Sequence, residues 1–370
     1  MEVLKKYIYQ VRGVSYKPSD VCDNEKGVPI LRAGNICDNR ICLDDIVCVD
    51  SSKIRSEQFL RDGDVLICAS SGSKSVVGKA AIYKLNNFIS AFGAFCKVVR
   101  IKEDENVIAD FIRLYFSSKF YREQISNKSQ GANINNIKAE DIDSLLINIP
   151  DIQTQNIAVS ELDKIQAALD NKKEQLKKLD ELIQAKFYEM FGDPVVNDKG
   201  WDIKELGEIC ELKAGKNIKA SELYEIQSDG LYPCYGGNGL RGYINKYSHQ
   251  GTFSLIGRQG ALCGNVKLAK GLFYATEHAV VVTPRIEINA LYVYYVLTFL
   301  ELNRYAKGVA QPGISVQVIN GVYFPLPPLP LQEAFAAYVE KVEQAKAIVN
   351  QEIAHLQELL NSRMDYYFRK

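Results

Sequence analysis

The sequence repeats itself at a fixed offset of 177 residues, and the longest repeated stretch is amphipathic. Residues 150–191 match residues 327–368 without a gap, and the match continues upstream. Matched pairs in the long stretch are Pro150 and Pro327, Gln155 and Gln332, Leu162 and Val339, Ile165 and Val342, Leu176 and Ile353, Leu179 and Leu356, Ile183 and Leu360, and Phe191 and Phe368. Upstream pairs are Gly131 and Gly308, Ile137 and Ile314, Ile142 and Ile319, and Ile149 and Leu326. The repeat predicts two globular units, each followed by one helix, a plan that suits gripping two segments of one extended ligand.

The long repeated stretch has helical periodicity in both copies. Apolar residues recur at steps of three and four from Leu162 to Met190 and from Phe335 to Leu360, with lysines interrupting. Seams this narrow, with Lys, Glu and Gln elsewhere, predict two helices that pack mainly on each other as a coiled coil. In the alternative, each helix covers its own globular half, but a helix of about 40 residues is about 60 Å long, more than a small domain can cover. We expect antiparallel pairing around a pseudo-twofold axis, because a globular unit separates the helices in the chain.

The repeat predicts an α+β protein with two globular domains and two long helices. Strand-like runs at 47–49, 64–68, 80–83 and 96–101 precede a predicted helix at 109–125. The second half repeats this order, with strands near 255–256 and 279–283 and a helix at about 290–302. Gly192 and Pro194 end the first long helix. The predicted boundaries are 1–150 for the first globular domain, 151–191 for the first long helix, 192–200 for a linker, 201–327 for the second globular domain and 328–370 for the second long helix.

Composition argues against membrane, disulfide-rich and metal-binding proteins. No apolar run approaches the roughly 18 residues that span a membrane, and the N-terminus lacks the apolar stretch of a signal peptide. The nine cysteines include no Cys-x-x-Cys pair, and Cys48, Cys68, Cys96 and Cys263 lie in apolar, strand-like runs. This usage predicts reduced, buried thiols in a cytoplasmic protein. The three histidines are scattered and have no metal-ligand spacing.

The formal net charge is zero, but two long windows contain no acidic residue. With 45 acids in 370 residues, windows as long as 65–102 and 230–276 should hold roughly five or six each. Their basic residues are Lys74, Lys79, Lys84, Lys97, Arg100 and Lys102 in the first window, and Arg241, Lys246, Arg258, Lys267 and Lys270 in the second. The windows correspond within the repeat, since 63–67 parallels 251–256 and two glycines follow in each copy. They are either solvated loop faces or a pair of footprints for an anionic ligand, one per repeat.

Three motifs resemble enzyme signatures but lack the required context. Residues 237–242 spell G-x-G-x-x-G, yet no acidic residue follows before Glu277 and the sequence opens no helix there. Residues 72–79 resemble a phosphate-binding loop, but five residues rather than four separate the glycines, and Ala80 stands where Ser or Thr would hold magnesium. Asp151 with the distant Asp202 and Lys204 imitates a nuclease signature, and helix capping explains Asp151 better. The chain therefore looks like a binding protein.

Several short motifs, weak individually but specific in their order, resemble one protein family. They are Gly27-Val28-Pro29-Ile30-Leu31-Arg32 with Asn35-Ile36, Gly63-Asp64-Val65-Leu66-Ile67, Gly78-Lys79-Ala80-Ala81-Ile82, Met190-Phe191-Gly192-Asp193-Pro194 leading to Lys199-Gly200-Trp201, Tyr232-Pro233-Cys234-Tyr235-Gly236-Gly237-Asn238-Gly239, and Pro325-Leu326-Pro327-Pro328-Leu329 before Gln332. Together with the helix repeat, they make nearly the whole chain similar to the specificity subunit of a Type I restriction-modification system. In one departure, Trp201 has no counterpart near Met1, so the first strand of the N-terminal domain is expected to be shortened or formed differently.

The resemblance implies a fold, partners and a division of labour. It implies two target recognition domains, each reading one half of a split sequence in double-stranded DNA, held apart by the antiparallel helix pair. It also implies that the helices recruit two DNA-methyltransferase subunits, which in turn support restriction subunits. S-adenosylmethionine would be bound by the methyltransferase, and no cofactor by this chain, which has no Asn/Asp-Pro-Pro-Tyr/Phe motif. The alternatives are a stand-alone DNA methyltransferase or nuclease with its own active site, and a scaffold without DNA contact.

Candidate DNA-binding residues follow from the acid-free loops. Lys and Arg neutralise phosphates without reading sequence, whereas Arg, Lys, Asn, Gln and Ser on loops can read base edges. In the first domain the candidates are Arg32, Asn35, Ser71, Ser73, Lys74 and Lys79. In the second they are Tyr235, Asn238, Arg241, Arg258, Gln259 and Lys267. For each single residue, the alternative is a place in a turn or a solvated side chain.

Overall fold

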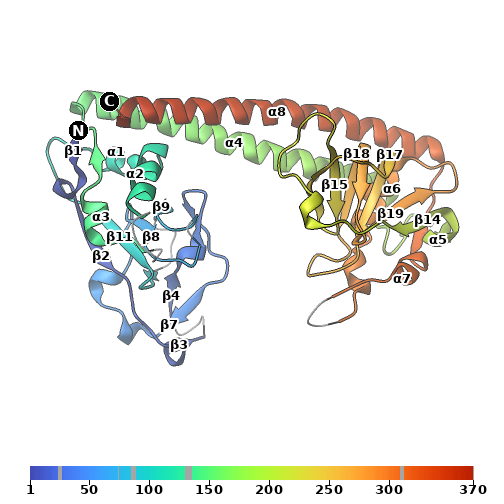
Figure 1. Ribbon diagram of the computed structural model, residues 1–370, viewed down its shortest axis with the longest axis horizontal. Coiled ribbons are helices and arrows are strands. Elements are labelled where there is room, and N and C mark those ends of the chain that lie inside the picture. The colour runs from blue at the N-terminus through green and yellow to red at the C-terminus, as the bar shows by residue number, and fades with distance from the viewer. Residues whose placement is uncertain (24–26, 74, 85–88, 130–135, 309–311, 370) are drawn as a thin grey trace. The chain divides into compact units, whose positions relative to one another are not determined.

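The computed structural model describes residues 1–23, 27–73, 75–84, 89–129, 136–308 and 312–369 (Figure 1). The chain forms two compact units: unit 1 contains Met1–Lys173 and Gln351–Lys370, and unit 2 contains Glu174–Asn350. Each unit combines a globular part with a portion of each long helix, α4 (Ile152–Phe191) and α8 (Leu329–Arg369). No described helix has an apolar stretch of the length that crossing a membrane requires.

Unit 1 is built around a four-stranded antiparallel sheet. The strand order is β2 (Ile8–Arg12), β11 (Cys96–Ile101), β8 (Val65–Cys68) and β9 (Ala80–Ile82). Successive side chains of β8 enter different apolar clusters, Val65 and Ile67 on one face and Leu66 and Cys68 on the other, as the pleat requires. A second sheet has the order β10 (Ala91–Phe92), β4 (Val28–Leu31), β7 (Val47–Val49) and β3 (Val21–Cys22). The remaining elements are the hairpin β5 (Ile36–Cys37) and β6 (Arg40–Ile41) and the helices α1 (Ala109–Tyr115), α2 (Lys119–Ser129) and α3 (Ala139–Asp143).

Unit 2 repeats the core sheet of unit 1 in the same strand order. The equivalent strands are β14 (Cys210–Ala214), β19 (Ala279–Pro284), β17 (His249–Gly257) and β18 (Val266–Ala275). The sheet then continues into β15 (Tyr232–Gly236) and β16 (Gly239–Ile244), which form a hairpin. The helices are α5 (Leu206–Ile209), α6 (Ala290–Phe299) and α7 (Val316–Asn320). Ile256, Val280 and Val282 face the core that contains α6, so the predicted strand near 255–256 is one of the most buried.

The start of each long helix is fastened to its unit by the same buried glutamine. Gln155 is fully buried and Gln332 is 3% exposed. Their Nε2 atoms donate to Pro150 O (2.7 Å) and Pro327 O (2.8 Å), and their Oε1 atoms accept from the amides of Ile108 (2.8 Å) and Asn289 (3.0 Å). Four of these six residues form two pairs that the offset of 177 residues already matches, Gln155 with Gln332 and Pro150 with Pro327. The predicted duplication is therefore confirmed at the level of single hydrogen bonds.

A small two-stranded sheet precedes each long helix. In unit 1, β1 (Glu2–Val3) pairs with β12 (Leu146–Ile147), and in unit 2, β13 (Ile203–Glu205) pairs with β20 (Tyr323–Pro325). β1 is one residue shorter than β13, in agreement with the shortened first strand that the missing tryptophan predicts. Trp201 itself donates from its indole to Phe191 O at 2.9 Å and so ties the chain before β13 to the end of α4.

The two long helices run antiparallel. Within unit 1, Arg363 Nη2 donates to Glu161 Oε2 at 2.7 Å and Lys172 Nζ lies 2.7 Å from Glu352 Oε2. Within unit 2, Lys346 Nζ lies 2.7 Å from Asp180 Oδ1. Residue numbers thus rise along α4 as they fall along α8, which confirms the predicted direction. The helices do not pack only on each other, however, because α4 residues such as Leu162 and Phe187 belong to the globular cores.

Two predicted helices have different ends in the structure. The segment predicted as one helix at 109–125 is two helices, α1 and α2. The break lies at Ser118, whose Oγ donates to Tyr115 O (2.6 Å) and accepts from the Tyr121 amide (3.1 Å), so one hydroxyl caps both helix ends. The helix predicted at 290–302 ends at Phe299, because Glu301 adopts a left-handed conformation (φ 51°) before a short 3-10 helix.

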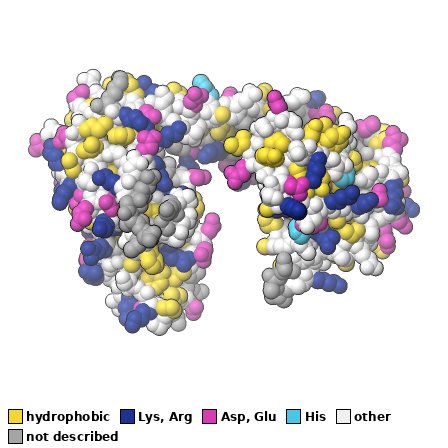
Figure 2. Space-filling model, in the orientation of Figure 1, with side chains coloured by type: hydrophobic (Ala, Val, Ile, Leu, Met, Phe, Trp, Pro, Cys, Tyr) yellow, Lys and Arg dark blue, Asp and Glu magenta, His cyan; other side chains and the backbone are white. Residues whose placement is uncertain are grey.

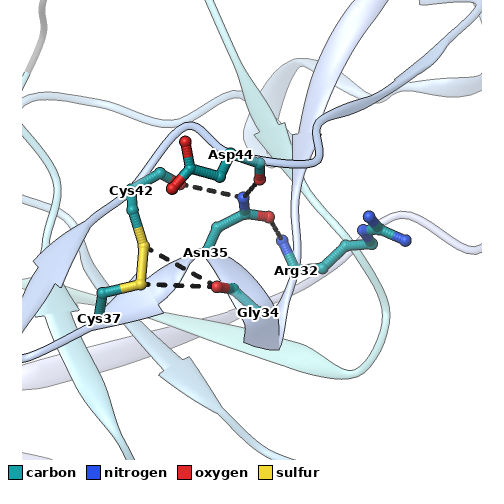
Figure 3. The surroundings of a disulfide bond; sticks show 6 residues. All are labelled: Arg32, Gly34, Asn35, Cys37, Cys42 and Asp44. Atoms are coloured by element: carbon teal, nitrogen blue, oxygen red, sulfur yellow. Dashed lines mark hydrogen bonds between the residues drawn. A yellow bond between two sulfur atoms is a disulfide. The ribbon is translucent and has the colours of Figure 1, made fainter. Parts of the chain in front are cut away.

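The prediction that all cysteines are reduced is wrong for one pair. Cys37 and Cys42 form a disulfide that closes the β5–β6 hairpin (Figure 3). Asp38 and Asn39 at its tip both have positive φ angles (46° and 61°), the geometry of a tight two-residue hairpin turn. The turn pairs β5 with β6 and brings Cys42, the residue after β6, near Cys37 in β5. Among the free cysteines, Cys48, Cys68, Cys96 and Cys263 are buried as predicted.

Candidate nucleic-acid interface

Several connections of unit 2 meet at one end of its core sheet, and we call them loop cluster 2. They are residues 236–239, 258–265, 276–278 and 312–314. Arg258 donates its amide to His278 O (3.1 Å) and accepts from the Ile314 amide (2.9 Å), and Asn265 Nδ2 donates to Asn238 Oδ1 (3.1 Å). A Cβ on Gly257 would lie 1.9 Å from Gly237 O, so the loops approach too closely for any side chain there. Figure 2 shows Lys and Arg side chains beside histidines on the visible face of unit 2.

The same connections form loop cluster 1 in unit 1. They are residues 32–35, 69–73, 75–79, 93–95 and 136–137. Ile137 donates its amide to Ala69 O (2.7 Å), as Ile314 does to Arg258 O, and Ala69 donates to Phe95 O (2.9 Å), as Arg258 does to His278 O. These bonds confirm that the first acid-free window corresponds to the second in space. In each unit, the loops of the acid-free window therefore lie at the equivalent end of the core sheet.

Five of the predicted residues of unit 2 come together at loop cluster 2: Asn238, Arg258 and Gln259 lie within it, and Arg241 in β16 and Lys267 in β18 lie beside it. Asn238, Arg241, Gln259 and Lys267 are exposed and Arg258 is half-buried. Side-chain carbons of Lys267 lie 3.6–3.7 Å from the point where Gly239 would carry a Cβ, and the Arg241 side chain covers Gly236. Arg241, Arg258 and Lys267 thus bring three cations to one hairpin and its neighbouring loop, an arrangement suited to an anionic ligand.

Tyr235, the sixth predicted residue of unit 2, is half-buried beneath the hairpin. Its ring lies edge-on to Phe273, with centroids 5.8 Å apart, and packs against a buried apolar cluster. Burial raises the pKa of its hydroxyl. Tyr235 packs the β15–β16 hairpin against the buried apolar cluster, whereas the residues after it form the hairpin tip.

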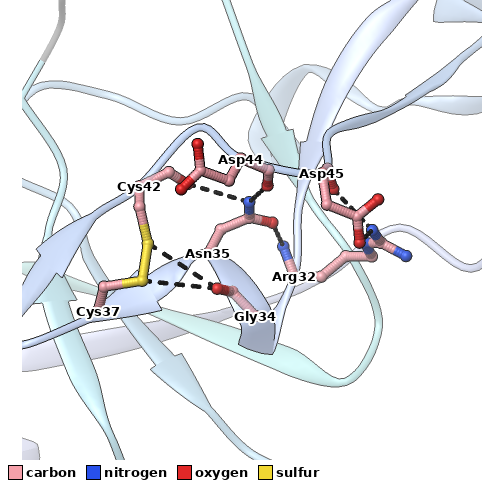
Figure 4. A network of polar contacts seen from close by, with 7 residues as sticks. All are labelled: Arg32, Gly34, Asn35, Cys37, Cys42, Asp44 and Asp45. Atoms are coloured by element: carbon pink, nitrogen blue, oxygen red, sulfur yellow. Dashed lines mark hydrogen bonds and ion pairs between the residues drawn. A yellow bond between two sulfur atoms is a disulfide. The ribbon is translucent and has the colours of Figure 1, made fainter. Parts of the chain in front are cut away.

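In unit 1, the side-chain amide of Asn35 bonds to backbone groups of its own loop (Figure 3). The residue is 2% exposed. Its Oδ1 accepts from the Arg32 amide (2.9 Å), and its Nδ2 donates to Cys42 O (3.0 Å) and Asp44 O (2.7 Å). Arg32 points outward and its Nη2 donates to Asp45 Oδ2 at 2.9 Å (Figure 4). Because this ion pair is exposed, with side chains 38% and 91% accessible, Arg32 can exchange Asp45 for a phosphate at low cost.

The serine loop of unit 1 is a turn with exposed hydroxyls. Ser71 Oγ accepts from the Ser73 amide (3.2 Å), and the hydroxyls of Ser73 and Ser75 lie 2.9 Å apart. Ser73 is exposed, and Ser71 and Lys79 are half-buried. Lys74, the remaining predicted residue, lies outside the described residues.

Part of the basic charge in the first window serves the fold. Arg100 is 5% exposed and bonds Asp64 through Nε (2.9 Å) and Nη2 (2.9 Å). Lys97 Nζ donates to Gln10 Oε1 (3.4 Å), and burial lowers its pKa. Lys102 Nζ donates to backbone carbonyls, among them Lys5 O (3.0 Å). The window is therefore less available to a ligand than its count of basic residues indicates.

Sequence reasoning missed one element of each cluster, the β-turn that leads into β11 or β19. In the β11 turn (residues 93–96), Cys96 donates its amide to Gly93 O at 2.9 Å, and in the β19 turn (residues 276–279), Ala279 donates to Thr276 O at 3.0 Å. The central residues are Ala94 and Phe95 in unit 1 and Glu277 and His278 in unit 2. The second acid-free window ends at Thr276, immediately before Glu277, so it leaves out the centre of the β19 turn. Phe95 is left out because candidate DNA-binding residues are chosen among polar side chains. Among the described residues, no three His, Cys, Asp or Glu side chains form a group able to hold a metal ion.

Duplicated α+β units that carry equivalent loop clusters beside an antiparallel helix pair define a class of two-site binding proteins. Within that class, the chain belongs to the family of the Type I restriction modification DNA specificity domain, whose sequence profile matches residues 8–181 and 198–358.

Curated relatives include the Type I restriction enzyme EcoprrI specificity subunit of Escherichia coli, 42% identical over 166 residues, which are 44% of this chain and 41% of the relative. The MjaIX specificity subunit of Methanocaldococcus jannaschii is 22% identical over 313 residues, covering 75% of this chain and 71% of the relative. The chain spans only 37–41% of the length of the first curated relatives that it matches.

Two solved structures share the fold. The crystal structure of the Type I restriction-modification S subunit from M. genitalium superposes with a TM-score of 0.57 at 15% identity, covering 99% of this chain and 95% of that one. A chain from a study of complex assembly and conformational transition of the type I R-M system superposes with a TM-score of 0.54 at 18% identity, covering 97% of both. These similarities bear out the predicted α+β architecture of two repeated units and two long helices.

Proposed function

We propose that this chain is the DNA-binding specificity subunit of a Type I restriction-modification complex, in which each globular unit reads one half of a bipartite target. The observation that carries the proposal is the loop cluster built twice, by equivalent hydrogen bonds, at the same end of equivalent sheets. A protein with one such cluster would read one continuous sequence, whereas two clusters suit a split site. The functional domains are then residues 1–150 and 201–327, with the long helices at 151–191 and 328–370 and a linker at 192–200.

The side chains of the clusters divide the work of binding. Arg258, Lys267 and Lys79 supply positive charge for phosphates, which gives affinity and register without sequence information. Arg241, Asn238 and Gln259 are exposed at the hairpin tip and the adjoining loop, where they can meet base edges. Asn35 and Tyr235 hold the loops in shape.

The partners follow from the same duplication. Two equivalent units offer one surface twice, so two methyltransferase subunits would bind, and restriction subunits would join through them. S-adenosylmethionine would sit on the methyltransferase, and this chain would contribute specificity without catalysis. The complex would act in the cytoplasm on double-stranded DNA. The family membership and the similarity to specificity subunits of Type I restriction enzymes support this assignment.

The experiment is methylation mapping by sequencing in cells that carry the partner methyltransferase, with and without this chain. Methylation of a split target only when the chain is present is the expected result. Purified chain incubated with labelled S-adenosylmethionine and DNA should transfer no methyl group. Transfer by the purified chain alone would favour a stand-alone DNA methyltransferase and overturn the proposal.

A further inference from the structure

The β11 turn and the β19 turn occupy the same position in the two units. Gly93 donates its amide to Leu31 O (2.9 Å) in β4, the strand before the candidate loop at 32–35. Thr276 likewise donates its amide to Tyr235 O (2.9 Å) in β15, the strand that leads into the candidate loop at 236–239. Phe95 and His278 accept through their carbonyls from the loops that contain Ser70 and Arg258. Each turn therefore lies between the two loops that carry the candidate DNA-binding residues of its unit.

In unit 1 this position holds an exposed aromatic ring. Phe95 is 72% exposed, although it is a large apolar side chain, and its neighbour in the turn is Ala94. The two residues line a hollow of about 970 Å³ together with Arg32, Asn35 and Ser70. Asp44 and Asp45 line the same hollow. Among the described residues of the unit, no other ring contacts Phe95, and exposed apolar side chains at such places mark contact surfaces.

In unit 2 the same position holds hydrogen-bonding groups without partners. Among the described residues, Thr276 Oγ1, Glu277 Oε2 and His278 Nδ1 are buried atoms with no hydrogen-bond partner. Glu277 Oε1 lies 3.1 Å from His278 Nε2, and the two side chains remain 33% and 42% exposed. Orphaned polar atoms are costly, and three in consecutive residues of one turn call for a specific cause, such as a ligand that supplies the missing bonds. Because both side chains reach the surface, rotation about their side-chain bonds brings the unpartnered atoms to a ligand.

We propose that the central residues of these two turns determine the base read at one position of each half-site, which rests on the proposed function in DNA recognition. Ala94 and Phe95 pack against the C5-methyl group of a thymine, the one apolar group that a base edge presents in the major groove. Glu277 and His278 read a base with an exocyclic amino group, adenine or cytosine, because a carboxylate accepts from that amino group and repels a carbonyl edge. One structural position thus gives opposite preferences in the two units.

The test for unit 1 removes a single methyl group from the DNA. The intact complex of this chain with its methyltransferase is titrated with duplexes in which each thymine of the half-site of unit 1 is replaced in turn by uracil. We expect one position at which uracil weakens binding about four-fold, the effect of one buried methyl group. In Phe95→Ala, uracil and thymine should bind equally at that position. Leu146→Ala, an exposed apolar residue of the small sheet, is the control and should keep the discrimination.

The test for unit 2 removes an amino group. Adenines are replaced by purine and cytosines by 2-pyrimidinone, one at a time, in the half-site of unit 2. We expect a loss of about 5- to 150-fold at one position, and no further loss from the analogue at that position in Glu277→Ala. The position at which the analogue acts decides between adenine and cytosine. Glu287→Ala, an exposed acid of the same unit, is the control.

The outcomes separate this inference from the proposed function. If the wild-type complex shows no preference for any sequence, the proposed function fails. If it binds a split site but no uracil and no amino-free analogue weakens binding, or if Phe95→Ala and Glu277→Ala retain the wild-type sensitivities, the turns do not read bases and the inference is overturned. The analogue measurements on the wild-type protein do not depend on how any variant folds. Exchanging the central pairs between the two turns should move the thymine preference from one half-site to the other.

Discussion

The buried glutamines at the start of α4 and α8 allow one stability prediction to be tested twice in the same chain. Gln155 makes three hydrogen bonds to backbone groups: Nε2 donates to Asn106 O (2.9 Å) and Pro150 O (2.7 Å), and Oε1 accepts from the Ile108 amide (2.8 Å). Gln332 makes two such bonds, to Pro327 O and from the Asn289 amide. Replacement by Met keeps the volume and the helix propensity but leaves these backbone groups without partners.

At about 1 kcal/mol for each lost bond, Gln155→Met should destabilise unit 1 by about 3 kcal/mol and Gln332→Met should destabilise unit 2 by about 2 kcal/mol. The assay is chemical unfolding combined with amide hydrogen exchange, because exchange reports each unit separately. In Gln155→Met the Ile108 amide should lose protection, while the Asn289 amide keeps it. Gln153→Met, at an exposed position of the same helix turn, is the matched control and should change stability by less than about 0.5 kcal/mol.

The reasoning is refuted if Gln155→Met costs less than about 1 kcal/mol, or if either substitution destabilises the other unit as much as its own. The first result would mean that the backbone groups find other partners. The second would mean that the two units unfold as one, so that the duplicated helix attachments act on the whole chain.

Three further predictions concern charge and helix length. Asp64→Ala should cost about 3–5 kcal/mol, because it leaves the buried Arg100 guanidinium without its carboxylate, whereas Asp45→Ala at an exposed pair should cost at most about 1 kcal/mol in the same unfolding assay. Arg241→Ala or Arg258→Ala should change recognition only of the half-site of unit 2. Loss of a guanine contact would reduce discrimination at one base pair by about 1–3 kcal/mol, whereas loss of a phosphate contact would make the salt dependence of binding shallower. Altered recognition of the half-site of unit 1 would contradict the assignment. One heptad added at matching positions of α4 and α8 lengthens each helix by about 10 Å. The gap between the half-sites, measured by methylation sequencing, should widen by at most about three base pairs at 3.4 Å each. An unchanged gap in an active variant would show that the helices do not set the spacing.

The helices and the core strands were predictable because their signal is periodic and local. The repeat correctly predicted that Gln155 and Gln332 are equivalent, since the same hydrogen bonds recur where the same backbone recurs. The antiparallel pairing followed from chain connectivity alone. Helix ends were less predictable, because one hydroxyl of Ser118 divides a segment whose apolar periodicity continues through it.

The site was predictable as a region but not residue by residue. Charge windows found the loops, since a binding surface for an anion needs few acids over a long stretch. They could not distinguish Arg258 from Arg100. Arg258 is half-buried, and its side chain makes no hydrogen bond or ion pair with another described residue, whereas Arg100 bonds an aspartate 36 positions earlier. Nor could they show that the side-chain amide of Asn35 makes three hydrogen bonds to backbone groups of its own loop. Both outcomes depend on contacts between residues that are distant in the sequence or on loop closure, which a residue type alone does not specify.

The places where the two units differ bear on the kind of DNA site they read. The offset between equivalent residues of the two units grows toward the N-terminus. It is 177 before the long helices (Leu146 and Tyr323) and 183 at the start of β11 and β19 (Cys96 and Ala279). It is 189 at the end of β8 and β17 (Cys68 and Gly257) and 202 in the first strands (Val3 and Glu205). The offset is constant within strands and changes only across the connections, several of which form the loop clusters. The largest change falls in the segment that contains the disulfide-closed β5–β6 hairpin of unit 1. Since the frame is kept while the loops differ in length and the β11 and β19 turns differ in chemistry, the two half-sites should differ in sequence, and the target should be an asymmetric split site rather than a palindrome.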